Sequence, residues 1–344
     1  MLFYKDLCYN TFSHRNILHF LGECMKILID VLGCDNSENL IDGLALAINE
    51  VKDVTLVAVG DKEYIQNRLK DVAFDKSRLE IIHAGDVITN HDSPLAVRQK
   101  TDSSLVVAYN ALKNEDIPVM ITAGNTGAMI VGALILLGRI DADARPTLAT
   151  FLPTDNGKTV CLADCGANVD CKPADMVQFA RHAVEYMQKV YGIPSPRVGL
   201  LSVGTEDTKG NAQTKETFAL LKQSGLHFVG NMEGKALLSG DYDVVVADGF
   251  QGNVLLKGVE GAAKSVIFRA LTLLKKHADK DVDLEFVKKA FVDLTKSIDF
   301  NTQGGAVLLG VKKPVIKAHG SATAETVVSV VKQAVRMIES NYAK

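Results

Sequence analysis

The four residues Gly-Asn-Thr-Gly at positions 124–127 have types and a spacing that could bind an anion. Residues 119–122 precede them as a short predicted strand, and a long apolar segment with helical spacing follows. A helix that begins directly after such a turn has unpaired backbone N–H groups and a partial positive charge from the helix dipole. The candidate phosphate ligands are therefore Gly124, Asn125, Thr126 and Gly127. The alternative is a capped turn without a ligand, because the turn lacks the Lys of a Walker loop and the full glycine pattern of a dinucleotide-binding turn.

Polar and glycine-rich clusters follow several other predicted strands. The clusters are DVLGCDN, TAGNTG, ADCGANVDCKP, SVGTEDTKGN, ADGFQGN and KAHGSA. In an open α/β sheet, ligands bind outside the carboxyl ends of the strands. The clusters are therefore expected to meet in one cleft, and this favours the phosphate interpretation of the Gly-Asn-Thr-Gly turn.

The elements that would position these clusters are alternating strands and helices. Apolar, β-rich runs alternate with helical patterns from the start, as in KILIDVLG, NLIDGLALAINEV, DVTLVAVG, KEYIQNRLKDV and LEIIHAG. This rhythm predicts an α/β fold with a mostly parallel sheet buried on both faces. Further strands are expected at residues 119–122, 147–152, 159–163, 197–201, 227–230, 244–247 and 315–318. Long helices are expected at residues 173–191, 210–222, 252–276 and 322–340.

Composition and charge argue against several classes of protein. The chain has 344 residues, 47% of them hydrophobic, which suits one large domain or two closely packed ones. Its formal charge of −3 argues against nucleic acid as a partner over the whole surface. The cysteines form no C-x-x-C pair and have no nearby His at zinc-ligand spacing, so reduced thiols in a cytoplasmic protein are expected and a metal site is not. They are Cys8, Cys24, Cys34, Cys161, Cys165 and Cys171.

Residues 1–24 are expected to be an N-terminal extension outside the core. Their apolar residues are divided by His14, Arg15 and Asn16, so they do not form the apolar region of a secretion signal. Met25 then opens the first predicted strand. The apolar run at residues 128–137 is too short to span a bilayer, so no transmembrane segment is expected.

Six motifs along the chain together resemble one protein family. They are AGNTGA, RPTLATFLPT, GANVDCKP, RVGLLSVGTEDTKGN, DGFQGNVLLKGVEG and GGAVLLGVKKPVIKAHGS, in that order, within about residues 25–340. This combination resembles the bacterial phosphate acyltransferases of phospholipid synthesis, the PlsX family. Two departures stand out: Cys34 in DVLGCD replaces the second glycine of the family's D-A-M-G-G-D loop, and residues 1–24 have no counterpart.

The resemblance implies a fold, a reaction and partners. The fold would be a three-layer α/β/α sandwich similar to isopropylmalate dehydrogenases and phosphotransacetylases. Residues 25–344 would form a single catalytic unit of two closely packed subdomains with a boundary near residues 153–158, usually as a homodimer. The enzyme would move a fatty acyl group from acyl carrier protein to inorganic phosphate, without a cofactor, and its acyl phosphate would pass to a membrane glycerol-3-phosphate acyltransferase.

This chemistry needs positioned donors more than a nucleophilic side chain, because phosphate itself attacks the thioester. The lack of a G-x-S-x-G elbow is consistent with that. The expected catalytic residues are Lys209, as a positive charge for phosphate or the oxyanion, and Asn253, as an amide donor to carbonyl or phosphate. His319 is the third, as a proton donor to the leaving thiol or a phosphate ligand. The respective alternatives are a solvated loop lysine, a helix cap and a structural histidine.

Five more residues are candidates for phosphate or substrate binding. Arg145 could bind phosphate bidentately, or could pair with Asp141 or Asp143. The other four are expected to shape loops or orient donors, and they are Asn168, Asp170, Asp30 and Asp35. Cys34 could in principle accept the acyl group as a thiolate, although the family it resembles has glycine there.

Alternatives from other classes stay open. A short-chain phosphotransacetylase using coenzyme A would share the phosphate chemistry. A metal-dependent decarboxylating dehydrogenase could hold a divalent ion with Asp241, Asp243 and Asp248, although the predicted strand at residues 244–247 separates the first two from the third. A non-catalytic module that binds phosphate or acyl chains is the remaining alternative.

Residues 261–280 could contact another surface. Helical spacing places Val266, Ile267, Ala270, Leu271 and Leu274 on one face, with Lys264, Lys275, Lys276 and His277 toward the ends. We expect a subunit or core contact here, with a weak peripheral attachment to the inner face of the cell membrane as the alternative. The acidic carrier protein is expected to dock on Lys and Arg near the cleft mouth.

Overall fold

The computed structural model describes residues 24–277, 285, 287, 289–291, 294 and 304–343. The predicted N-terminal extension, residues 1–24, lies outside the described residues except for Cys24. Residues 278–280 of the proposed contact helix also lie outside them.

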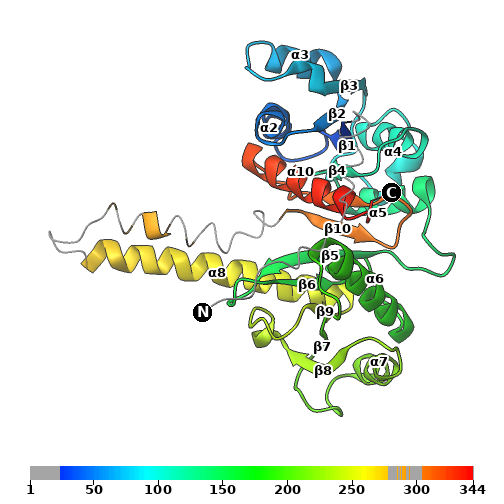
Figure 1. Ribbon diagram of the computed structural model, residues 1–344, viewed down its shortest axis with the longest axis vertical. Coiled ribbons are helices and arrows are strands. Elements are labelled where there is room, and N and C mark those ends of the chain that lie inside the picture. Colours follow the sequence, from blue (N-terminus) through cyan, green and yellow to red (C-terminus); the bar gives the residue numbers. More distant parts are fainter. Residues whose placement is uncertain are drawn as a thin grey trace, which may run out of the picture.

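The described strands form one sheet in the order β3-β2-β1-β4-β11-β10-β5-β6-β9-β7-β8 (Figure 1). Seven neighbouring pairs are parallel, and the β5–β6, β5–β10 and β10–β11 pairs are antiparallel. The strands are β1 Met25–Asp30, β2 Val54–Gly60, β3 Leu79–His83, β4 Met120–Thr122, β5 Thr147–Pro153, β6 Thr159–Ala163, β7 Val198–Ser202, β8 Phe228–Glu233, β9 Val244–Val246, β10 Ala306–Leu309 and β11 Val315–Lys317. The predicted mostly parallel sheet is confirmed, and its antiparallel centre was not foreseen.

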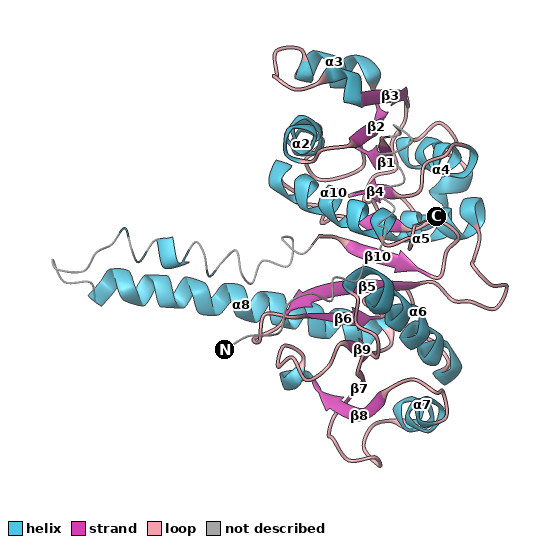
Figure 2. Cartoon of the chain, viewed as in Figure 1, coloured by secondary structure: helices cyan, strands magenta, loops and turns pink. Residues whose placement is uncertain are grey.

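Helices cover both faces of the sheet and give a three-layer α/β/α sandwich (Figure 2). One face packs against α2, α10, α6 and α7, and the other packs against α4 and α5 in one half and α8 in the other. The helices are α2 Ser37–Glu50, α3 Lys62–Leu69, α4 Ser104–Asn114, α5 Thr126–Gly132, α6 Pro173–Tyr191, α7 Ala212–Lys222, α8 Gly249–His277 and α10 Ala324–Glu339. The end of α8 extends beyond the body of the molecule (Figure 1).

The central strands are buried because both of their faces are apolar. In β1, Ile27 and Ile29 join the core under α2 and α10, whereas Leu28 joins the core under α4 and α5. Alternate side chains of a strand point to opposite faces, so a strand covered twice must be apolar at successive positions. This explains the runs KILID and VTLVAV in the sequence.

The course of the chain links the two halves of the sheet. β5 and β6 form a hairpin through the turn at residues 154–158, where the subdomain boundary is predicted, and the sheet continues across it. After α8 the chain returns through β10, β11 and α10 to the half that contains β1 and β4. The division into two subdomains therefore stays a prediction. Two such subdomains could not be separated by one cut in the chain, because the C-terminal elements belong with the N-terminal half.

Candidate active site

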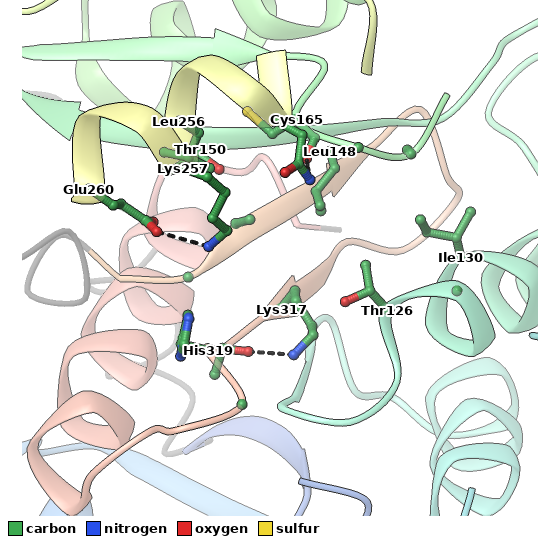
Figure 3. Close-up of a pocket in the computed structure, with 18 of the residues that line it drawn as sticks. Thr126, Ile130, Leu148, Thr150, Cys165, Leu256, Lys257, Glu260, Lys317 and His319 are labelled. Carbon is green, nitrogen blue, oxygen red and sulfur yellow. Dashed lines mark hydrogen bonds and ion pairs between the residues drawn. The ribbon is translucent and has the colours of Figure 1, made fainter. Parts of the chain in front are cut away.

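A cavity of about 560 Å³ lies between α5, α8 and the carboxyl ends of β4 and β11 (Figure 3). Residues from both halves of the sheet line it. The polar side chains of its wall are Thr126, Thr150, Asn253, Lys257, Glu260, Lys317 and His319. The apolar wall includes Ile130, Val131, Leu148 and Leu256. The cavity therefore combines charged and hydrogen-bonding groups with an apolar surface that could accept an acyl group.

The predicted phosphate turn contributes its second half to this cavity. Asn125 caps α5: its Oδ1 accepts from the Ala128 N–H at 3.0 Å, and its Nδ2 donates to the backbone oxygens of Thr89 and Asp92. The side chain of Asn125 thus caps α5 and holds the loop at residues 89–92, so its amide is not free to bind phosphate. Thr126 and Gly127 line the cavity, and their backbone N–H groups have no partner in the described part of the chain.

Gly124 serves the turn structurally. Its N–H donates to Thr122 Oγ1 at 3.1 Å, which ties the turn to the end of β4. At Gly127, an added Cβ would lie 2.7 Å from a ring carbon of Pro94. Glycine at position 127 therefore allows the residues around Pro94 to approach the start of α5 closely.

Lys317 is a cavity residue that the sequence interpretation missed. It ends β11, and its register partner on β4 is Thr122, which in turn pairs with Asp30 on β1. Lys317 Nζ donates to the backbone oxygens of Ala123 at 2.9 Å and Ala318 at 2.6 Å. Burial lowers the pKa of this lysine to about 8, so it carries a charge at pH 7. The motif KKPVIKAHGS contains it, but only the register of three strands identifies its neighbours.

Asp30 lies buried beside this lysine, on the same edge of the sheet. Its Oδ2 accepts from Thr122 Oγ1 at 2.8 Å, and its Oδ1 accepts from the Leu32 N–H at 3.3 Å. Burial raises the pKa of its carboxyl group to about 6, against the opposing effect of these hydrogen bonds and of the Lys317 charge. Asp30 does not line the cavity; it anchors the first loop beneath it.

His319 lines the cavity with a ring whose Nδ1 is already occupied. The Ser321 N–H donates to Nδ1 at 3.2 Å, and the Ser321 hydroxyl lies 2.7 Å from it. This assigns the proton of the neutral ring to Nε2. Burial and then the Lys257 charge lower the pKa of His319, so the ring is neutral at pH 7. It can act there as an N–H donor.

Asn253 lies on the cavity wall, but it is not the cap of α8. The helix begins at Gly249, and Asp248 Oδ1 accepts the Gln251 N–H at 2.7 Å. Asn253 therefore occupies the second turn, and the predicted cap at this residue is wrong. Its Nδ2 donates to the Cys165 backbone oxygen at 3.1 Å, which leaves its second amide N–H available to a ligand.

Arg145, Asn168 and Asp170 lie outside the cavity wall. Asn168 Nδ2 donates to the Pro146 oxygen at 2.7 Å and to Asp164 at 2.9 Å, which supports its expected role in shaping the loop. Arg145 pairs with Asp175 at 3.1 Å and also donates to the backbone oxygen of Asp170. Pairing of Arg145 with Asp141 or Asp143 is therefore wrong.

Asp35 and Cys34 belong to the first loop, also outside the cavity wall. The Asp35 carboxylate accepts from Asn90 Nδ2 at 3.1 Å, and its N–H donates to the oxygen of Gly320, which lines the cavity. Cys34 Sγ lies 3.6 Å from Ser37 Oγ, and burial raises the pKa of its thiol. A raised pKa disfavours the thiolate and hence acyl transfer to Cys34.

Lys209 lies in the loop after β7, away from the cavity wall. Its side chain is 52% exposed, and its Nζ lies 4.0 Å from Glu206 Oε1. The structure does not bring it together with Asn253 or His319. Its role in phosphate binding stays a prediction.

Two of the three acidic residues considered for a divalent ion have other partners. Asp243 binds the Arg197 guanidinium at 2.9 and 3.0 Å, and Asp248 caps α8 and binds the Gln251 side chain. Within the described ranges, no group of three or more His, Cys, Asp or Glu residues is arranged to hold a metal ion. The dehydrogenase alternative therefore has no metal centre at these residues.

Comparison with known proteins gives a family and a fold. Residues 25–344 match a family model described as "Fatty acid synthesis protein". A protein of Thermoanaerobacter pseudethanolicus named "Phosphate acyltransferase" is 41% identical over 323 residues, 92% of this chain and 95% of that protein. Among solved structures, a phosphotransacetylase from Streptococcus pyogenes has a TM-score of 0.61 at 17% identity, over 96% of this chain and 98% of that one. A 4-hydroxythreonine-4-phosphate dehydrogenase from Klebsiella pneumoniae has a TM-score of 0.55 at 14% identity, over 92% and 100%.

Proposed function

Since the chain belongs to the fatty acid synthesis protein family, whose curated relatives are named phosphate acyltransferase, we infer that it transfers an acyl group to inorganic phosphate for phospholipid synthesis. The structural observation that best supports this function is the cavity between α5 and α8. It combines unpaired N–H groups at a strand-to-helix turn, a neutral histidine donor and an amide with an apolar wall. Phosphate and an acyl thioester need both kinds of surface.

The reaction balances without a nucleophilic side chain. An oxygen of hydrogen phosphate forms a bond with the thioester carbonyl carbon, and the C–S bond breaks with its electron pair on sulfur. The phosphate proton passes to that sulfur, so the products are the acyl phosphate dianion and the free thiol. The protein needs to orient the two reactants, stabilise the oxyanion and exclude water, because water would hydrolyse the product.

The cavity residues divide these tasks in the proposed mechanism. The Thr126 and Gly127 N–H groups bind phosphate at the start of α5, with Gly124 and Asn125 holding the turn in place. The free amide N–H of Asn253 donates to the thioester carbonyl as negative charge develops on its oxygen. His319 donates through Nε2 to phosphate or relays the proton toward sulfur. Lys209 could join them only if its loop closes over the cavity.

The proposed acyl donor is acyl carrier protein, and the proposed acceptor of the product is a membrane glycerol-3-phosphate acyltransferase. Both follow from the family resemblance. A homodimer is proposed on the same ground. Within the described ranges, no helix is long and apolar enough to cross a bilayer. The free cysteines of the described residues and the family resemblance lead us to propose a cytoplasmic enzyme with peripheral membrane contact.

A short-chain phosphotransacetylase is the second candidate, favoured by the structural likeness to the Streptococcus pyogenes enzyme. Release of carrier thiol from long-chain acyl carrier protein, measured with and without phosphate, separates the two. We expect phosphate-dependent release with the long-chain carrier substrate. Reaction of short acyl-coenzyme A alone would instead assign the cavity to phosphotransacetylase activity.

A further inference from the structure

The cavity wall carries two lysines, and the mechanism above uses neither of them. Lys257 already forms an ion pair, with Glu260 Oε2 at 2.8 Å. Lys317 has no ion pair within 4.0 Å in the described part of the chain. A partly buried ammonium group without an ion-pair partner is a favourable binding site for an anionic ligand.

Two hydrogen bonds to backbone oxygens hold the Lys317 ammonium group in place. Its partners are the oxygens of Ala123 and Ala318. Ala123 directly precedes the Gly-Asn-Thr-Gly turn, and Ala318 directly precedes His319. An ammonium group has three N–H donors, so one remains after these two bonds. Figure 3 shows Lys317 between Thr126 and His319, the two groups that the mechanism assigns to phosphate.

Asp30 also favours the charged form of this lysine, although it is bound to Thr122 and does not reach Lys317 as an ion pair. The charged and titratable groups that face Lys317 are Asp30, Asp35 and Cys34, which raise its pKa, and Lys257, which lowers it. Burial outweighs them. A bound dianion would add a negative charge that favours the protonated lysine.

We propose that Lys317 is the phosphate-binding cation of this cavity, with its third N–H and its charge directed at the hydrogen phosphate held by the first turn of α5. This inference rests on the proposed function for the identity of the ligand. It assigns to Lys317 the point charge that the sequence interpretation assigned to Lys209.

The proposal has a consequence for pH. The Lys317 ammonium group loses its proton as pH rises above its pKa of about 8. His319, whose pKa is lowered, is already neutral at that pH. Phosphate binds the protonated lysine, so its affinity falls as pH rises from 7.5 to 9.5 and approaches a loss of about tenfold per pH unit above the pKa. Phosphate is mostly the dianion at pH 7.5 and becomes more completely so as pH rises, so its own titration does not cause this fall in affinity.

The test is calorimetric titration of the full chain with inorganic phosphate at pH 7.5 and 9.5. We expect Lys317→Met to weaken binding by about tenfold or more at pH 7.5 and to remove the pH dependence. Lys313→Met is the matched control. Lys313 also donates to backbone oxygens, those of Leu112, Glu115 and Ile117, but it does not line the cavity. Unchanged phosphate affinity in folded Lys317→Met would overturn the proposal.

Lys317→Arg keeps the proposal testable if the Met variant does not fold. Arginine stays charged above pH 9.5, so this variant should bind phosphate with a flat pH profile. A wild-type pH profile in Lys317→Arg would overturn the proposal. Phosphate binding that requires Lys317, in a protein without acyl transfer, would support this inference and contradict the proposed function. Acyl transfer with a phosphate affinity that does not depend on Lys317 would support the proposed function and contradict this inference.

Discussion

At the scale of single residues, the proposed chemistry depends on donors that are oriented before the substrate binds. Asn253 is oriented by the Cys165 oxygen, and His319 by Ser321. Fixed donors stabilise developing charge without reorganising during the reaction. The close neighbours of these donors matter as well: an added Cβ at Gly166 would lie 2.7 Å from Asn253 Nδ2, and Gly166 has a φ of +125°.

Loss of the Asn253 amide should therefore slow turnover without unfolding the protein. Asn253→Ala is expected to lower kcat by about a hundredfold, the typical effect of removing one oxyanion donor. Steady-state assays with acyl carrier protein thioester measure it, and Val254→Ala, an exposed neighbour on the same helix, should keep the wild-type rate. A near-normal rate in Asn253→Ala would exclude this residue from the mechanism.

The same decrease is predicted for Lys209→Ala, although Lys209 lies away from the cavity wall. The physical reason would be closure of the loop after β7 over bound substrate, which would bring the ammonium to the phosphate. Lys222→Ala is the control, because Lys222 is also exposed and binds Asp207 of the same loop. If both variants turn over like the wild type, Lys209 is a solvated loop lysine.

Asp30 should make stability depend on pH in an unusual direction. Its folded-state pKa of about 6 exceeds the ordinary value of 3.8, so the folded state binds more protons between these values. The contribution of this carboxyl group to the free energy of unfolding therefore falls as pH rises from about 3 to 7, by about 3 kcal/mol in all. Chemical denaturation of Asp30→Asn across this range should lack that decrease. Asp35→Asn, in the same loop, should retain it, and a wild-type profile in Asp30→Asn would contradict the assignment.

At the scale of elements, the start of α8 positions Asn253 by packing against the loop after β6. The Gly249 N–H donates to the Asn168 oxygen at 2.8 Å, and an added Cβ at Gly252 would overlap the backbone oxygen of Asp164. Asp164 is itself buried and accepts from the N–H groups of Leu148 and Ala167. The helix and the loop therefore cannot separate without disturbing the cavity.

Two glycines of α8 provide a matched test of this packing. Gly252→Ala should destabilise the fold by about 1–3 kcal/mol and lower activity, because the new methyl group meets backbone. Gly258→Ala places its methyl group in open space and should stabilise the helix by roughly 0.5–1 kcal/mol. Thermal unfolding and turnover measure both effects. Equal stability of the two variants would show that α8 does not pack on the loop as described.

Local patterns in the sequence predicted much of the fold, and what they missed requires long-range pairing. The long apolar runs placed β1, β2 and β5 correctly, and the helical spacing placed α6 and α10. β10 was missed because it has only four residues, directly between Gly305 and Gly310. α4 was missed because a short apolar run such as LVVAY fits a strand as well as a helix. The cavity lysine could not be identified, since its neighbours depend on the register of β1, β4 and β11.

At the scale of the whole molecule, the cavity exists because the two halves of one sheet meet. α5 belongs to the half with β1 and β4, and α8 belongs to the half with β6 and β9. The antiparallel strands β5 and β10 join these halves and contribute to the wall through Leu148 and Ala306. The wall of the cavity is thus built by both halves of the sheet.

The outer part of α8 is where contact with another surface is proposed. Val266, Phe268 and Leu273 are 66%, 71% and 56% exposed, and the helix extends beyond the body (Figure 1). We predict weak, salt-sensitive binding to anionic vesicles that is lost in the Leu271→Glu/Leu274→Glu double variant while the oligomeric state stays that of the wild type. Vesicle flotation at low salt, with the oligomeric state measured in parallel, tests this.

Val203→Glu/Val229→Glu is the control for that experiment, because it adds the same charges at exposed positions on and after strands of the other end of the molecule. It should float like the wild type. Absence of wild-type binding at low salt would show that α8 is not a membrane contact. Dissociation or unfolding of the Leu271→Glu/Leu274→Glu variant would assign its apolar face to packing between proteins.

The central claim is that phosphate itself attacks the thioester in this cavity. It is tested most directly by running the reaction with ¹⁸O-labelled phosphate and acyl carrier protein thioester, followed by mass spectrometry of the product and of the quenched protein. We expect an acyl phosphate in which every phosphate oxygen, including the bridging one, carries the label, and a protein without a covalently bound acyl group. An unlabelled bridging oxygen, or an acyl group on a cysteine of the chain, would contradict it.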